Sequence, residues 1–338
     1  MLFAGICAAL VLILIVLNVS IGLYKIGFLD SYRVLIDHLS GVVPDNLHDI
    51  REDHIIFNQR LPRAIAAACV GAVLAVSGAA MQSTLKNPLA DPYTTGISSG
   101  ASFGVCIFAV MDISLLPGLS GDYGMIANAF VFSLIPAGAI IVCSRVFSAS
   151  PTSVILIGIA VMYVFSACTT LIKLYAEPED LEVVYRWSLG NLGKATWDNI
   201  GYMAASCAIA VIFMTAAGRR LNILTMNDES VMSVGIDPKK ERAIILAVVS
   251  LCTALAVSFT GTIGFVGLVI PHIIRIFMGS NNTFLIPASA FAGAVFLLAA
   301  DSVAKVAGTY DLPVGVITSI VGGPVFLYIL IRQRRRAW

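Results

Sequence analysis

The chain has 338 residues, of which 58% are hydrophobic and only 12% are charged, and its net charge is +1. Soluble domains carry about 25% charged residues, so this composition excludes an ordinary soluble protein and indicates that most of the chain lies in a lipid bilayer. The net charge indicates no class of partner, and we predict no nucleic-acid partner.

Stretches without charged residues locate the membrane-spanning helices. A span needs about 20 residues with few or no charges. Nine stretches meet this requirement: 1–24, 64–85, 92–111, 123–144, 146–172, 199–218, 243–274, 276–300 and 312–331.

The stretch 243–274 is too long for one crossing, because a helix over all of it would measure about 48 Å against a hydrocarbon core of about 30 Å. Gly261, Gly264, Gly267 and Pro271 lie in its second half, where they favour a break. We therefore predict a helix to about residue 260 and a short, broken one to about residue 279, which gives about ten spans in an all-α polytopic membrane protein.

The distribution of basic residues predicts the sidedness. Lysine and arginine cluster in the loop 219–242 and at the end of the chain, in Arg332, Arg334, Arg335 and Arg336. Cytoplasmic loops carry such excesses, so both clusters, and with ten spans both termini, are predicted to be cytoplasmic. The acidic loop after residue 172 is predicted to lie outside. So is the segment 25–63, although it holds five basic residues.

No linker or low-complexity tract divides the chain, so we predict a single transmembrane domain over residues 1–338. One internal similarity is present: residues 63–78 and 242–261 both begin Arg-Ala-Ile and both contain Leu-Ala-Val-Ser. The predicted topology runs these two helices in opposite directions, as in an inverted repeat. A chance match in so apolar a chain remains an equal alternative.

Several kinds of chemistry have no motif here. The string closest to a phosphate-binding loop, residues 190–195, lacks both its spacing and its hydroxyl group, so the chain is not expected to hydrolyse ATP or to be an enzyme. No two cysteines form a Cys-x-x-Cys pair, and we predict neither a metal site nor a cofactor.

Asp301, with Lys305 as its i,i+4 partner, is the one acid near a span interior. An ion-coupled secondary transporter is therefore the less favoured alternative.

Two further alternatives rest on short patterns. Residues 96–100 fit Gly-x-Ser-x-Gly with Ser98 as nucleophile and His272 as a possible base, but such an elbow needs a strand before its helix. Close helix packing by small residues is the preferred interpretation.

A group of acids and histidines in the outer segment could bind a cation, although a solvated loop explains the group as well. The group consists of Asp45, His48, Asp49, Glu52, Asp53 and His54.

Five segments, which together extend from residue 60 to the end of the chain, resemble the FecCD-like family of ABC importer permeases. This family imports iron-siderophores, haem, cobalamin and similar chelates. The segments are Arg60-Leu61-Pro62-Arg63 before a helix ending Ser77-Gly78-Ala79-Ala80-Met81-Gln82, Asn87-Pro88-Leu89-Ala90-Asp91-Pro92, Gly261 to Arg275, Ala300-Asp301 with Lys305, and Leu312 to Phe326.

The resemblance implies ten helices, a second permease copy in a homodimer, two cytoplasmic ATPase subunits and an extracytoplasmic binding protein. It implies that Asn87, Pro88 and Leu89 form a cytoplasmic gate. It also implies that Arg60, Arg63 and Lys305 meet acidic residues of the binding protein at the outer face. No acid within their own segments is placed to neutralise both arginines.

The loop 219–242 contains Glu229-Ser230-Val231-Met232-Ser233-Val234-Gly235, which resembles the Glu-Ala-Ala-x-x-x-Gly coupling motif of importer permeases. Ser230 and Val231 replace the two alanines. The resemblance implies a short helix, ended by Gly235, that fits a cleft on the ATPase.

No motif identifies the substrate. A ferric siderophore is the first expectation, followed by cobalamin or haem, and then by an oxyanion such as molybdate.

Overall fold

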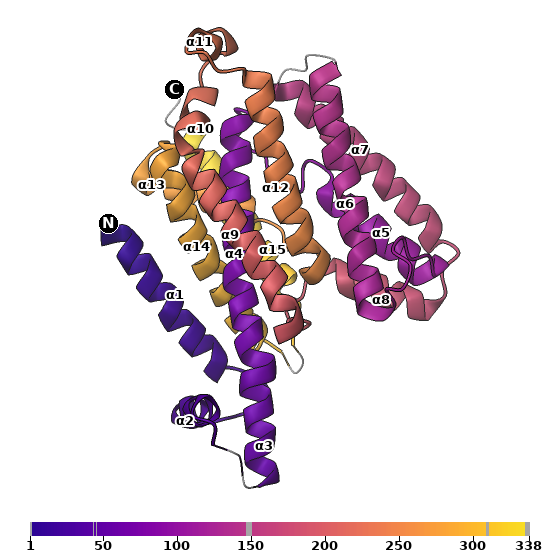
Figure 1. The fold of residues 1–338 in the computed structure, drawn as a ribbon, viewed down its shortest axis with the longest axis vertical. Coiled ribbons are helices and arrows are strands. Elements are labelled where there is room, and N and C mark those ends of the chain that lie inside the picture. Colours follow the sequence, from indigo (N-terminus) through magenta and orange to yellow (C-terminus); the bar gives the residue numbers. More distant parts are fainter. Residues whose placement is uncertain (1, 43, 45, 147–150, 309–310, 335–338) are drawn as a thin grey trace.

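The computed structural model describes residues 2–42, 44, 46–146, 151–308 and 311–334, and these are helical with no strand among them (Figure 1). Within these ranges, six helices are long and apolar enough to cross a membrane and four shorter ones are apolar. The ten principal helices are α1 Leu2–Ser20, α4 Leu61–Thr84, α5 Ile97–Met111, α6 Gly121–Val146, α7 Pro151–Lys173, α9 Trp197–Ala216, α12 Pro238–Thr260, α13 Val266–Met278, α14 Asn282–Ala304 and α15 Val314–Arg334.

Each predicted span coincides with one of these helices, so the predicted polytopic all-α fold of about ten spans is confirmed. Short helices lie between them: α2 Phe28–Leu39, α3 Leu47–Asp53, the π-helix η1 His54–Arg60, α8 Pro178–Ser188, α10 Gly218–Leu224 and α11 Asp228–Ser233. Of the basic C-terminal cluster, Arg335 and Arg336 lie outside the described residues.

The predicted break within 243–274 is present between α12 and α13. Gly261 and Phe265 both have a positive φ, of +70° and +69°, which a right-handed helix cannot contain. Backbone N–H and carbonyl groups that leave a helix at membrane depth need hydrogen-bond partners from other segments of the protein. Here the Ile263 N–H donates to the Tyr93 hydroxyl at 2.9 Å, and the Thr260 carbonyl accepts from the Asn191 N–H at 2.7 Å.

Helix α4 lies at the centre of the bundle and is buried along almost its whole length. Small residues allow its backbone to approach neighbouring helices closely. A Cβ atom on Gly71 would collide with the carbonyl oxygen of Gly293 in α14, and one on Gly78 would collide with that of Gly267 in α13. These two glycines therefore fix how α4 meets α13 and α14.

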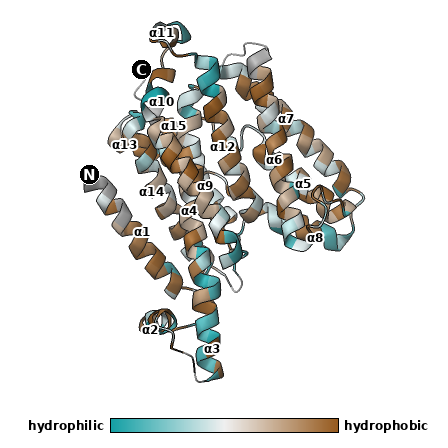
Figure 2. Ribbon diagram, in the orientation of Figure 1, coloured by the Kyte–Doolittle hydropathy of each residue, from teal (hydrophilic) through white to brown (hydrophobic). Residues whose placement is uncertain are grey.

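Segments predicted to share a side of the membrane contact one another. At one end, the Lys194 ammonium lies 2.8 Å from an Asp122 carboxylate oxygen, and the Trp197 indole N–H donates to the Phe57 carbonyl at 3.0 Å. At the other end, Asn222 in α10 donates to the Asn281 side chain at 2.7 Å. Figure 1 shows α11 at the top and α2 and α3 at the bottom, and Figure 2 shows hydrophilic residues gathered toward both ends.

Helices α4 and α12, which carry the internal similarity, run in opposite directions in Figure 1. This orientation is the one that an inverted repeat requires. The repeat itself stays a prediction.

Candidate functional site

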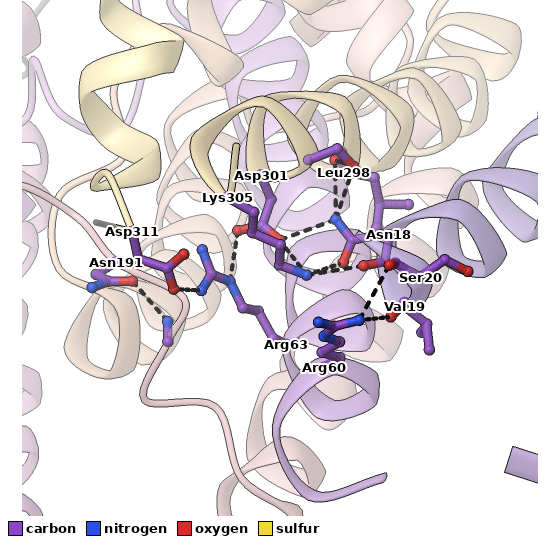
Figure 3. Close-up of polar contacts among 12 residues, drawn as sticks. Asn18, Val19, Ser20, Arg60, Arg63, Asn191, Leu298, Asp301, Lys305 and Asp311 are labelled. Atoms are coloured by element: carbon purple, nitrogen blue, oxygen red, sulfur yellow. Dashed lines mark hydrogen bonds and ion pairs between the residues drawn. The ribbon is translucent and has the colours of Figure 1, made fainter. Parts of the chain in front are cut away.

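Arg60 and Arg63 are neighbours in the sequence, and Lys305, from a distant part of the chain, lies close to them (Figure 3). All three belong to the side of the molecule predicted to face outward. All three are buried, with exposed fractions of 5%, 6% and 3%. Buried charges require partners, and the contacts of these three residues therefore decide what they can do.

Arg63, in the first turn of α4, is neutralised by two acids from another part of the chain. Its Nε donates to Asp301 Oδ1 at 2.8 Å and its Nη1 to Asp311 Oδ2 at 2.5 Å. Asp301 Oδ2 also lies 3.3 Å from Lys305 Nζ, so the i,i+4 contact expected from the sequence is present. Asn18 in α1 donates to the same oxygen at 3.0 Å and accepts from Lys305 at 2.7 Å.

Arg60 makes a different set of contacts. Its guanidinium donates to the carbonyls of Val19 at 3.1 Å, Ser20 at 3.2 Å and Tyr24. The last carbonyls of a helix have no partner within the helix, so Arg60 closes the C-terminal end of α1 and holds it against η1.

The three basic residues are thus part of an internal network rather than an exposed patch, and their predicted docking role stays a prediction. The sequence did not reveal this burial, because the neutralising acids Asp301 and Asp311 lie far along the chain. A pocket of about 310 Å³ opens beside the network and is lined by Arg60, Arg63, Lys305 and Asp311 among others. Glu52 also acts electrostatically on Arg60, so three carboxylates, those of Glu52, Asp301 and Asp311, lie near the three cations.

The predicted gate, Asn87-Pro88-Leu89, forms a tight turn after the end of α4. The Asn87 side-chain oxygen accepts from the Leu89 N–H at 2.8 Å, and the Asn87 carbonyl accepts from the Ala90 N–H at 3.1 Å. Leu89 is about half exposed. Lys86 precedes the turn in a left-handed conformation with φ of +49°, which is uncommon for a residue other than glycine.

The predicted short helix of the loop 219–242 is present as α11, and Gly235 ends it. Asn227 caps its start by accepting from the Ser230 N–H at 3.2 Å. Gly235 has φ of +79° and its N–H donates to the Met232 carbonyl at 2.9 Å, as in a glycine C-cap. Val231 is buried beneath the helix, whereas Glu229 is exposed. Met232 and Val234, which are 56% and 59% exposed, give the loop an apolar outer surface.

Asp228, which the motif comparison did not single out, anchors α11 to the bundle. Its carboxylate accepts from Arg242 in α12 at 2.9 and 2.5 Å, and it lies 3.2 Å from Lys86 Nζ. The hydrogen bonds from Arg242, and then those from Lys86, lower the pKa of Asp228 from 3.8 to about 2. A carboxylate whose pKa is lowered on folding stabilises the folded state at any pH above its ordinary pKa. This stabilisation is lost as the pH falls through the lowered pKa. Near neutral pH this carboxylate is therefore ionised and fully paired.

A second pocket, of about 500 Å³, lies against the break between α12 and α13. Irregular backbone within a membrane protein often lines a polar cavity, and small side chains with several hydroxyls line this one. They are Tyr93, Ser98, Ser188, Leu189, Thr262, Gly264, Gly315, Val316, Ser319 and Ile320. Only the break at 261–265 could have pointed to this pocket from the sequence.

The contacts do not support the nucleophile pattern around Ser98. Gly96 starts α5 from a turn rather than from a strand. His272 is not among the residues that line the pocket of Ser98, and its Nδ1 lies 2.8 Å from the carbonyl of Leu268 in its own helix. The preference for helix packing at residues 96–100 agrees with Gly100 and Gly104, where a Cβ atom would meet the backbone of α6.

Of the acids and histidines of the outer segment, His48, Asp49, Glu52 and Asp53 line a pocket of about 400 Å³ between α2 and α3, whereas His54 does not. His38 Nδ1 lies 2.7 Å from Asp53 Oδ1 there. Within the described parts of the chain, no group of three histidine, cysteine or acidic side chains is arranged to hold a metal ion. Asp45 lies outside the described residues.

The fold defines a class of protein, the polytopic helical membrane proteins. Comparisons with known proteins agree. The chain is 36% identical to the hemin transport system permease protein HmuU of Yersinia pestis, over 84% of this chain and 85% of that protein. It is 32% identical to the vitamin B12 import system permease protein BtuC of Citrobacter koseri, over 87% and 88%. A solved metal-chelate-type ABC transporter in an inward-facing conformation matches with a TM-score of 0.84 at 25% identity, over 97% of this chain and 98% of that one. The FecCD transport family model matches residues 10–332, and the chain belongs to this family.

Proposed function

We propose that the chain is the membrane-spanning permease subunit of an ATP-driven importer of a metal chelate. The observation that carries this proposal is α11, a capped helix ended by Gly235 that presents exposed Met232 and Val234 at one end of the bundle. An apolar, rigidly held surface of this kind suits docking to a cytoplasmic ATPase. Membership of the FecCD family supports the same assignment.

The proposed assembly has two copies of this chain, two cytoplasmic ATPase subunits and an extracytoplasmic binding protein. It lies in the cytoplasmic membrane with both termini inside, and the whole chain acts as one permease domain. Within it, Asn87, Pro88 and Leu89 serve as the cytoplasmic gate. Glu229, Ser230, Val231 and Gly235 form the ATPase-coupling helix.

A ferric siderophore is the proposed substrate, with haem, cobalamin and molybdate as the other candidates. The named substrates of the relatives HmuU and BtuC support the class of metal chelates. The pocket at the α12–α13 break is the proposed wall of the translocation path, because its hydroxyls and glycines offer weak polar contacts to a large ligand. Weak contacts favour passage over retention.

The alternative, an ion-coupled transporter, would need a free acid within the bundle. Asp301 is already bonded to Arg63, Lys305 and Asn18. Another buried acid beside the spans, Asp91, accepts from the Thr94 N–H at 2.8 Å. Reconstituted alone in liposomes, the chain is therefore expected to show no uphill uptake of haem, cobalamin or ferric siderophore under a proton or sodium gradient. Added ATPase, binding protein and ATP should produce it. Gradient-driven uptake by the chain alone would favour the alternative.

The variant Gly235→Asp is expected to abolish most coupled uptake while the permease stays folded. Its side chain would meet open space, but the left-handed conformation of residue 235 disfavours a side chain and the C-cap would distort. Uptake per ATP hydrolysed in the reconstituted transporter is the measurement. Gly279→Asp is the matched control, because Gly279 also has a positive φ (+75°), has open space around it and ends α13 at the same face. Normal uptake by Gly235→Asp would show that the ATPase docks elsewhere.

A further inference from the structure

The gate turn and the coupling helix are joined by one ion-paired side chain. Lys86, the residue before Asn87, extends to the start of α11, where its ammonium donates to the Met226 carbonyl and lies 3.2 Å from Asp228 Oδ1. These segments are separated by about 140 residues of sequence, and the contact links two regions to which the proposed function gives different tasks.

The other end of this link is rigid. Arg242, near the start of α12, is buried and donates to Asp228 through both terminal nitrogens, at 2.9 and 2.5 Å. A two-pronged guanidinium–carboxylate pair fixes orientation as well as distance. A displacement of α11 must therefore move Asp228 relative to α12, or carry the start of α12 with it.

The gate end of the link has an uncommon backbone conformation at the end of α4. Lys86 has φ of +49°, and a non-glycine residue in the left-handed region persists only where its surroundings hold it. The carbonyl of Met226 and the carboxylate of Asp228 are the contacts that hold the Lys86 side chain. The backbone at residue 86 is held separately, because the Asn87 N–H donates to the Gln82 carbonyl at 3.2 Å and closes the end of α4. Movement of the Lys86 side chain therefore acts directly on the turn that begins at Asn87.

We propose that Lys86 is a positioning residue that transmits movement of the coupling helix, through Asp228, to the cytoplasmic gate. The inference rests on the proposed function and adds to it the physical connection between ATPase and gate. When the ATPase displaces α11, the Lys86–Asp228 contact changes, and the turn at 87–89 changes conformation with it. Coupling between two sites requires such a contact with two arrangements that both sites bias.

The test uses the complete complex of permease and ATPase in lipid nanodiscs, where both faces are accessible. A cysteine at the half-exposed position 89, Leu89→Cys, reports on the gate through its labelling rate with a charged maleimide, measured with and without ATP. Labelling of the native cysteines is subtracted by using the chain without this substitution. Lys86→Met removes the ammonium and keeps the length of the side chain, Lys86→Arg keeps the charge, and Lys194→Met is the matched control.

Lys194 suits the control because it makes a similar ion pair, 2.8 Å from Asp122, at the opposite end of the molecule. We expect Lys86→Met to reduce the ATP-dependent change in labelling by about fivefold or more, the lower end of the range for coupled sites. The ATPase rate should be retained. Lys86→Arg should recover most of the response, and Lys194→Met should match the parent complex.

An unchanged response in Lys86→Met, or a loss that Lys86→Arg does not recover, overturns the inference. If Lys86→Met lowers the yield of folded complex, Lys86→Gln removes the same charge with a polar side chain and is judged by the same criteria. Failure of the proposed function is distinguishable, because the parent complex would then show no ATP-driven uptake. A parent complex with normal uptake whose residue 89 does not respond to ATP would overturn the gate assignment, and the inference with it.

Discussion

Replacing Asp301 by asparagine is expected to destabilise the protein by about 3 to 5 kcal/mol, the usual effect of breaking a buried ion pair. Asp301 is fully buried and its carboxylate serves Arg63 at 2.8 Å and Lys305 at 3.3 Å. Without the negative charge of Asp301, Lys305 would keep no carboxylate partner and Arg63 would keep only Asp311. The measurement is the temperature at which half of the purified permease loses its monodisperse elution on heating in detergent.

Asp311→Asn is the matched control, because it makes the same substitution in the other carboxylate that contacts Arg63. The side chain of Asp311 is 42% exposed, against 0% for Asp301, and exposed pairs contribute about 0–1 kcal/mol. We expect a small change in stability. Equal losses from the two variants would contradict the assigned role of Asp301.

The same control variant tests the predicted docking role of Arg60, Arg63 and Lys305. Neutralising Asp311 raises the net charge of the network by one, beside a pocket that opens at the end predicted to face outward. If acids of a binding protein dock there, its stimulation of the ATPase should rise at low salt and return toward the parent value at high salt. Unchanged stimulation at both salt concentrations would leave these residues with their structural contacts alone.

Gly78→Leu is expected to prevent the accumulation of folded permease. The side chain would enter the contact between α4 and α13, where even a Cβ atom collides with the carbonyl of Gly267. Overpacking of a core costs about 1–3 kcal/mol when side chains can adjust. Here the obstacle is backbone, which cannot rotate away, so we expect a loss beyond that range. The yield of monodisperse protein from detergent-solubilised membranes is the measurement.

Gly201→Leu provides the comparison, since Gly201 lies in α9 with no atom within 4 Å of an added Cβ. Its yield should equal that of the parent. Normal yield from Gly78→Leu would mean that α4 and α13 can separate without loss of the fold, contrary to the contacts that hold them.

The sequence alone determined the number and position of the spans, because the cost of a charge in hydrocarbon is a property of each residue and its neighbours. It likewise determined the break after residue 260, where closely spaced glycines allow backbone that a helix does not, and the end of α11 at Gly235. In each case the signal is local, and the structure has the element where the pattern predicted it.

Only the tertiary structure decided what the charged side chains contact. Arg60 and Arg63 suggested an exposed surface because their partners, the carbonyls that end α1 and the carboxylates of Asp301 and Asp311, belong to other segments. The i,i+4 contact of Lys305 with Asp301 was visible in the sequence, but the further contacts of this pair with Arg63 and Asn18 were not. The link from Lys86 to Asp228 was hidden for the same reason. A buried charge takes whichever partner the packing of helices brings within about 3 Å, and packing joins residues that lie far apart in the sequence.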